Sequence, residues 1–200
     1  VEIVATVANP LGVDPAPGCD TSGMTWSVTG GVCANGGLTL TANAAQEPVA
    51  ALHSAPAGFD DTSYMVTVQT TFSVTTGVWV QIVGFDSGSR CEGQGVDIQP
   101  DGSWRIDSFV NCAESEGIWR ASSLGPSPFS VTLRLQKQYF TAYINGKVIV
   151  NGGAFFTGGY PVISVGGTDG SSVTLTNVEL DTAVNYSAQW SVLQDGRQRG

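Results

Sequence analysis

The stretch from residue 129 to residue 180 constrains the fold most, because it reads as a run of β-strands joined by short turns. Apolar and polar residues alternate from Phe129 to Gln136, and this period of two is typical of a strand buried on one face. Asn145-Gly146 suits a two-residue turn that needs positive φ at both positions, so it predicts a hairpin. We expect the stretch to form a meander and the chain to be all-β. The predicted strands are Phe129–Gln136, Tyr139–Ile144, Lys147–Val150, Val162–Val165 and Val173–Leu180.

The rest of the chain has the same character, because 26 Gly and 9 Pro residues divide it into short runs. Pro100-Asp101-Gly102 is a strong turn signal and predicts a hairpin between its flanking runs. The polar stretch Asn111–Glu116 reads as a loop. The regular spacing of strands favours one β-sandwich domain over residues 1–184, followed by a polar tail or linker over residues 185–200. The upstream strands predicted are Val1–Val7, Met24–Val28, Gly37–Ala42, a short run at Leu52-His53, Tyr64–Val74, Val78–Phe85, Gly95–Gln99, Ser103–Asp107 and Ile118–Ala121.

Charge and hydropathy argue against several classes of partner. The chain has 8 basic and 17 acidic residues, for a formal net charge of −9. This charge disfavours binding to nucleic acid or to an anionic membrane surface. No apolar run approaches the roughly 20 residues that cross a bilayer, so we expect no membrane insertion. The sequence starts at Val1 without a signal-peptide pattern, so we expect a mature product or an excised domain.

The four cysteines are Cys19, Cys33, Cys91 and Cys112. No Cys-x-x-Cys pair occurs, and the one histidine, His53, is distant from all four in sequence, so a zinc site is not expected. Three pairings are possible, and we favour Cys19–Cys33 and Cys91–Cys112 because each closes a local loop. A disulfide of this kind adds about 3 kcal/mol of stability. Two disulfides indicate an oxidising compartment, so we expect an extracellular or cell-surface protein.

Two motifs in the stretch 129–180 carry a resemblance to a known superfamily. Tyr143-Ile144-Asn145-Gly146 follows the alternating strand, and Asn177-Val178-Glu179-Leu180 ends the last strand. This order resembles the second half of a concanavalin A-like, laminin-G-like jelly roll. The resemblance implies an antiparallel β-sandwich. It leaves the function open, because the superfamily includes lectins, carbohydrate-binding modules, glycosidases, lyases, peptidases and adhesion domains.

Sorting each predicted strand by parity gives a candidate binding face. On Val78–Phe85, for example, Val80 and Ile82 are assigned to the core, which turns Trp79 and Gln81 outward. Aromatic rings stack on the apolar faces of sugar rings, and planar amide, carboxylate and guanidinium groups pair with adjacent hydroxyls. The outward residues predicted to bind a ligand are Trp79, Gln81, Asp97, Gln99, Arg105, Asp107, Arg134, Tyr139 and Tyr143.

Catalytic alternatives have less support in the sequence. His53 is the only histidine and no Gly-x-Ser-x-Gly elbow occurs, so a nucleophilic triad is not expected. Glu114 and Glu116 would share a face in a strand, as the carboxylates of a retaining glycosidase require, but they lie in a predicted loop. The run around Gln81 resembles the middle section of the glutamic peptidases, which use a Gln and a Glu. Their second catalytic strand has no match, because Glu179 is the only predicted strand glutamate and its neighbours differ.

The superfamily resemblance also implies a structural calcium ion, held by loop carboxylates and carbonyl oxygens. Calcium takes 6–8 oxygen ligands, and no Asp-x-Asp-x-Asp loop is present. The acidic residues at predicted strand ends are Asp60, Asp61, Asp86, Asp169 and Asp181.

From these observations we expect an extracellular, non-catalytic recognition module of a larger secreted or cell-surface protein, with a glycan or polysaccharide as its partner. The first alternative is a protein-interaction or sensor ectodomain that uses the sandwich as a scaffold. The second is a glycoside hydrolase or a glutamic-type peptidase.

Overall fold

A computed structural model describes residues 5–6, 25–34, 37–45, 48–55, 60, 62–85, 91–121, 124–125, 127–154 and 158–181. Every regular element in these residues is a β-strand, which confirms the predicted all-β class. The strands are β1 (Ala5–Thr6), β2 (Thr25–Thr29), β3 (Gly31–Ala34), β4 (Gly37–Thr41), β5 (Val49–Ala55), β6 (Ser63–Phe72), β7 (Val78–Phe85), β8 (Gly93–Ile98), β9 (Trp104–Val110), β10 (Ala113–Glu116), β11 (Phe129–Gln136), β12 (Tyr139–Ile144), β13 (Lys147–Gly153), β14 (Tyr160–Gly167) and β15 (Ser172–Asp181).

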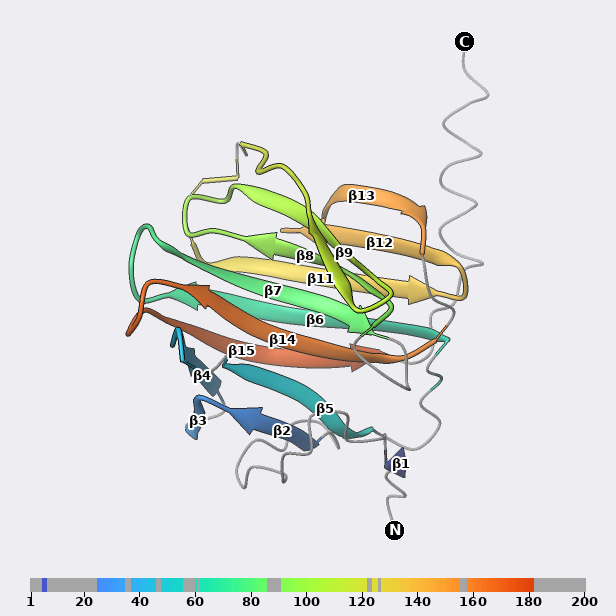
Figure 1. Ribbon diagram of the computed structural model, residues 1–200, viewed down its shortest axis with the longest axis horizontal. Coiled ribbons are helices and arrows are strands. Elements are labelled where there is room, and N and C mark those ends of the chain that lie inside the picture. The colour runs from blue at the N-terminus through green and yellow to red at the C-terminus, as the bar shows by residue number, and fades with distance from the viewer. Residues whose placement is uncertain are drawn as a thin grey trace.

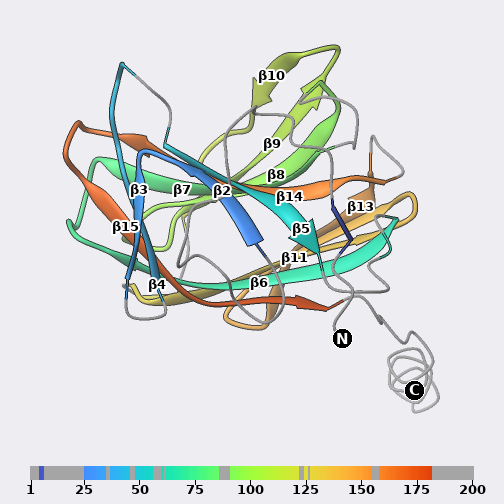
Figure 2. The same ribbon diagram turned by 90° about the horizontal axis from the view of Figure 1, so that it is seen from below.

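The strands form two antiparallel sheets packed face to face, a sandwich of the jelly-roll type (Figure 1). One sheet has eight strands in the order β1-β5-β14-β7-β8-β9-β10, and β2 pairs with β5 off this path. The other has seven strands in the order β13-β12-β11-β6-β15-β4-β3. Figure 2 shows the two layers from the side, with β7, β8 and β14 in one and β6, β11 and β15 in the other.

The core lies between the sheets and follows the predicted period of two. On β11, Leu133 and Leu135 are fully buried, and on β7 so are Val80 and Ile82. Burial of one such side chain contributes roughly 1.5–3 kcal/mol, so alternation along a few strands is enough to fix which face points inward. The residues between them therefore lie on the outer faces, as the parity sorting predicts.

The predicted meander is only partly correct. β11, β12 and β13 are sequential neighbours in the seven-stranded sheet. The chain then crosses to the other sheet, where β14 pairs with β5 and β7, and returns as β15 between β6 and β4. Alternation identifies the buried face of a strand but not the sheet to which the strand belongs, so the sequence does not reveal this crossover.

Two edge strands are missing from the sequence prediction. The stretch Asn111–Glu116, predicted as a loop, contains β10, which pairs along its length with β9. All four side chains of β10 are exposed, so it has no buried face to produce an alternating pattern. β3 is likewise an edge strand, with Val32 68% exposed. In place of the predicted strand Ile118–Ala121 the structure has a single bridge, between Arg120 and Trp104.

A disulfide joins Cys91 and Cys112, as predicted. Cys33 is also disulfide-bonded, and its predicted partner Cys19 lies outside the described residues. The predicted tail over residues 185–200 lies outside them as well. In the part of the chain that is described, no helix is long and apolar enough to cross a membrane.

Candidate functional site

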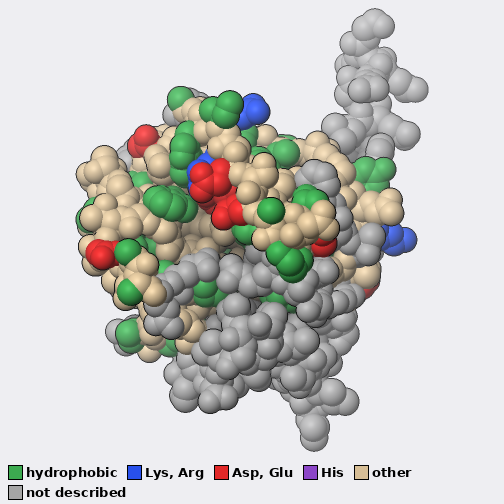
Figure 3. Space-filling model, in the orientation of Figure 1, with side chains coloured by type: hydrophobic (Ala, Val, Ile, Leu, Met, Phe, Trp, Pro, Cys, Tyr) green, Lys and Arg blue, Asp and Glu red, His purple; other side chains and the backbone are tan. Residues whose placement is uncertain are grey.

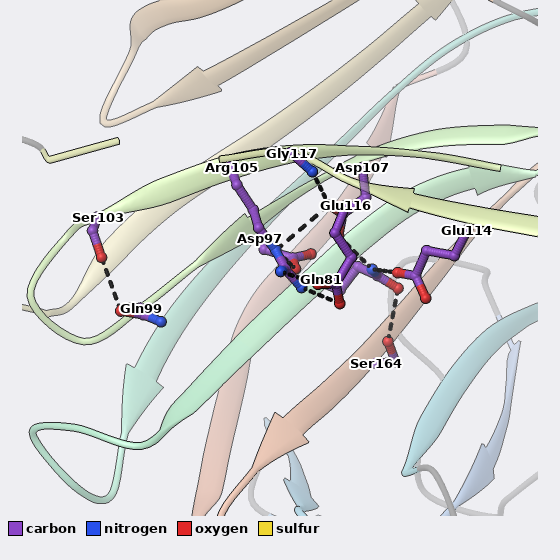
Figure 4. A network of polar contacts seen from close by, with 10 residues as sticks. All are labelled: Gln81, Asp97, Gln99, Ser103, Arg105, Asp107, Glu114, Glu116, Gly117 and Ser164. Atoms are coloured by element: carbon purple, nitrogen blue, oxygen red, sulfur yellow. Dashed lines mark hydrogen bonds and ion pairs between the residues drawn. The ribbon is translucent and has the colours of Figure 1, made fainter. Parts of the chain in front are cut away.

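The outer face of the eight-stranded sheet carries a connected set of polar side chains (Figure 4). These residues belong to five neighbouring strands, because the outward positions of β14, β7, β8, β9 and β10 fall in register. Within the described residues this is the densest network of side-chain hydrogen bonds and ion pairs. We call it the polar cluster, and its members are Gln81, Asp97, Arg105, Asp107, Glu114, Glu116 and Ser164.

Arg105 lies at the centre of the polar cluster. Its Nε donates a hydrogen bond to Oδ2 of Asp97 at 2.8 Å and lies 3.5 Å from Oδ1 of Asp107. Its two terminal nitrogens make a bidentate pair with Glu116, at 2.9 Å and 2.7 Å. Burial lowers the pKa of the guanidinium, but the bonds to Glu116 and Asp97 outweigh it and raise the pKa overall. Arg105 is therefore a fixed cation with its main donors engaged inside the protein.

Gln81 connects the other half of the polar cluster. Its amide nitrogen donates to Oδ2 of Asp107 at 3.0 Å and to Oε1 of Glu114 at 3.1 Å. Its amide oxygen accepts a hydrogen bond from the hydroxyl of Ser164 at 3.2 Å. Both N–H groups and the carbonyl of this buried side chain are satisfied, so its orientation is determined by its partners.

Asp97 and Asp107 form a buried carboxyl pair, since both side chains are fully buried. Desolvation and the neighbouring Asp107 raise the pKa of Asp97 to about 9, although Arg105 opposes the shift. Asp97 therefore carries a proton at neutral pH. Its Oδ1 atom receives no hydrogen bond from a donor of the described residues. A proton held on the pair explains how two buried carboxyl groups coexist next to one arginine.

Two tryptophans lie against Arg105. Its Cζ atom is 4.7 Å from the centroid of the Trp119 ring and 5.9 Å from that of Trp79, within the range of cation–π attraction. Trp79 is seated on Gly166, its cross-strand partner on β14. A Cβ atom at Gly166 would lie 2.3 Å from Cζ2 of this indole, so only glycine allows the ring to lie where it does.

The polar cluster reaches the surface through Glu114 and Glu116, which are exposed on β10. The side chain of Glu116 is 56% exposed, whereas that of Arg105 is 8% exposed. Desolvation, Asp107 and Glu116 together raise the pKa of Glu114, against the hydrogen bond from Gln81. Figure 3 shows acidic side chains gathered on this side of the molecule beside a shallow hollow. The accessible groups of the site are thus carboxylates, and the buried side chains beneath them are bonded to one another.

The structure divides the nine predicted binding residues into three groups. Five lie together on the eight-stranded sheet, whereas Gln99 pairs with Ser103 at the β8–β9 turn, apart from the others (Figure 4). The remaining three lie on the opposite sheet: Arg134 is buried in β11, Tyr139 is 64% exposed on β12, and Tyr143 is on β12. The nine therefore do not form one face. The five that lie together are Trp79, Gln81, Asp97, Arg105 and Asp107.

Four residues of this site are absent from the predicted set. Glu114 and Glu116 fall in a predicted loop, because β10 gives no strand signal. Ser164 lies on β14, which the sequence does not place beside β7. Trp119 follows β10 in an irregular segment, where alternation does not indicate which way a side chain points. The Asp97–Asp107 pairing across a hairpin is the part most accessible to sequence reasoning, since Pro100-Asp101-Gly102 fixes the turn.

Some of the acidic residues proposed as calcium ligands are located in the part of the chain that the structure describes. Among the described residues, no group of three or more His, Cys, Asp or Glu side chains is placed to hold a metal ion. Asp60 accepts hydrogen bonds from the backbone and hydroxyl of Thr62, and Asp169 accepts one from the backbone of Ala44, so both act as turn or loop residues. Asp61 and Asp86 lie outside the described residues. The structural calcium ion therefore stays a prediction.

No family profile and no curated protein sequence matches this chain. Solved structures do match its fold. The carbohydrate-binding module CBM66 from Bacillus subtilis aligns with a TM-score of 0.60 and 10% identity, over 78% of this chain and 94% of the module. Botulinum neurotoxin type C, whose cell entry depends on interaction with two ganglioside molecules, aligns with a TM-score of 0.56 and 14% identity, over 98% of this chain and 51% of that one. The Trypanosoma rangeli sialidase aligns with a TM-score of 0.54 and 16% identity, over 86% of this chain and 30% of the sialidase. At these identities the likeness establishes the β-sandwich fold that lectin-like modules share.

Proposed function

We propose that this chain is an extracellular carbohydrate-recognition module with a concanavalin A-like sandwich, and that it binds its ligand on the outer face of the eight-stranded sheet. The observation that carries the proposal is the juxtaposition of half-buried indoles with exposed carboxylates on one rigid face. An indole ring covers the apolar face of a sugar, and a carboxylate accepts hydrogen bonds from two adjacent hydroxyls. The sandwich match to a carbohydrate-binding module over 94% of its length supports the same assignment.

The arrangement of the carboxyl groups favours binding over glycoside hydrolysis. A retaining glycosidase holds two carboxyl groups about 5–5.5 Å apart with the scissile bond between them. Here the amide of Gln81 lies between Asp107 and Glu114 and is bonded to both. Asp107 is also fully buried. A sugar ring could not enter between these two groups without breaking the bonds that Gln81 makes.

The second candidate is a glutamic-type peptidase, and one contact favours it. Gln81 and Glu114 lie side by side, with their polar atoms 3.1 Å apart. A Gln and a Glu are the residue types that such peptidases use. In such an enzyme Glu114 would accept a proton from water and the amide of Gln81 would stabilise the resulting oxyanion. The raised pKa of Glu114 would make it a stronger base and would move the lower pH limit of its activity upwards.

Binding to immobilised glycans and insoluble polysaccharides, with and without calcium, tests the first proposal. Trp79→Ala should abolish binding while the protein stays folded. Tyr139→Ala removes an exposed aromatic side chain from the opposite sheet and should leave binding unchanged. If no glycan is retained in either condition, the carbohydrate proposal fails. Cleavage of a denatured protein, assayed from acidic to neutral pH and lost in Glu114→Gln, would instead support the peptidase.

A further inference from the structure

Most donors of the polar cluster are engaged within the protein. Both N–H groups of Gln81 go to carboxylates, and the hydroxyl of Ser164 donates to Gln81. Arg105 donates from Nε to Asp97 and from both terminal nitrogens towards Glu116. Its side chain is 8% exposed and two indoles lie against it, so a ligand cannot take over these bonds. The cluster therefore offers an arriving molecule almost no hydrogen-bond donor.

The acceptors are in excess and they reach the surface. Only Oε1 of Glu114 is bonded to a described residue, and that carboxylate lies exposed on β10 beside Glu116. The carboxyl groups of the cluster outnumber its one guanidinium, so the face stays negative even with a proton on the buried pair.

We infer that this face selects its glycan by charge: it takes chains that contain amino sugars, whose ammonium groups pair with Glu114 and Glu116, and it rejects chains that contain acidic sugars. This inference rests on the proposed carbohydrate binding and names its ligand class. An ammonium group brings three donors and a positive charge to a surface that lacks both. A uronic or sialic acid brings a carboxylate, which meets no free cation in the polar cluster and is repelled by Glu114 and Glu116.

Neutral glycans should bind with an affinity between those of the amino-sugar and the acidic glycans. Their hydroxyls supply donors without charge, so they bind Glu114 and Glu116 by hydrogen bonds alone. One exposed ion pair is worth up to about fivefold in affinity, so an amino-sugar ligand that reaches both carboxylates should bind more tightly than its N-acetylated form by up to about 25-fold.

Three ligands of equal length test the inference by calorimetry at mildly acidic pH and low salt: a glucosamine oligomer, the same oligomer fully N-acetylated, and an oligogalacturonate. The expected affinities fall in that order. Glu114→Gln should reduce the preference for the glucosamine oligomer by about fivefold, and added salt should reduce it in the wild type. Asp101→Asn, which removes the same charge at the exposed β8–β9 turn, should leave the preference intact.

Each result separates the inference from the proposed function. Binding of none of the three, nor of any other glycan, overturns the proposed function itself. Equal affinity for the three oligomers, or tighter binding of oligogalacturonate, overturns the charge selection and leaves carbohydrate binding standing. An equal loss of preference in Glu114→Gln and Asp101→Asn also overturns it, because the attraction would then come from the net charge of the whole chain.

Discussion

Replacing Asp97 by asparagine should remove a pH dependence of stability that the buried carboxyl pair imposes. In the folded protein the pKa of Asp97 is raised to about 9, mainly by burial and by Asp107. In the unfolded chain it returns to 3.8. Between these two values the folded state holds a proton that the unfolded state has released. The stabilising contribution of this proton is fully present below about pH 4 and is lost as the pH rises towards about 9.

The change of stability with pH follows from the one proton that Asp97 binds in the folded state only. Stability should fall by about 1.4 kcal/mol per pH unit, or about 4 kcal/mol between about pH 5 and pH 8. The amide introduced by Asp97→Asn would supply a donor to Asp107 without a titration and could still accept from Arg105. The variant should therefore have a flatter profile and exceed the wild type in stability at the alkaline end of this range.

Urea unfolding at intervals of about one pH unit from about pH 5 to pH 8 measures the free energy of unfolding of the wild type and of Asp97→Asn. Asp101→Asn is the matched control, because hydrogen bonds from Ser103 lower the pKa of Asp101 and confine its effect to more acidic pH. Glu114 is shifted in the same sense as Asp97, and the difference between variant and wild type removes its contribution. A wild-type profile that is flat or rises across this range, or an unchanged slope in Asp97→Asn, would refute the shared proton.

Three further predictions test other parts of the structure. Gly166→Ala should displace the Trp79 indole and weaken glycan binding by about tenfold or more in a folded protein. Gly152→Ala is the control, because a Cβ there meets nothing within 4 Å, and it should leave binding unchanged. Titration of both variants with the glycan measures the two affinities. Leu133→Ala should cost about 2–5 kcal/mol in urea unfolding, since the side chain is fully buried, and a loss under about 1 kcal/mol would contradict the assigned core. Replacing Cys91 and Cys112 by Ser should lower stability by about 3 kcal/mol, and the difference should vanish when both proteins are reduced, because Cys33 is disulfide-bonded as well.

The sequence predicts the buried faces of this protein better than its connections. Alternation in β7, β11 and β12 is strong because one face of each is fully buried, and the predicted strands Val78–Phe85 and Tyr139–Ile144 match the structure at both ends. The crossover of β14 has no such signal, since its residues are buried on both faces through most of the strand. Periodicity can identify a strand, but neighbours in a sheet depend on contacts between residues far apart in the chain.

The same limit explains what sequence analysis finds of the site. Gln81, Asp97, Arg105 and Asp107 lie on strands of clear parity joined by short connections, so their shared face is predictable. Their burial is not predictable, because it depends on β10 and on the segment around Trp119, neither of which shows a periodic pattern. Tyr139 and Tyr143 share the same parity but belong to the other sheet.

The Cys91–Cys112 disulfide closes the open end of the β8–β9 hairpin, opposite its turn. Cys91 lies two residues before β8 and Cys112 two residues after β9. In a hairpin whose outer face is charged, a slip of one residue would carry Asp97 and Arg105 into the sandwich core and bring Val96 and Ile106 to the surface. A covalent tie across the open end makes that misfolded state inaccessible once oxidation is complete. Oxidation after correct pairing should therefore fix the register of the β8–β9 hairpin in the mature protein.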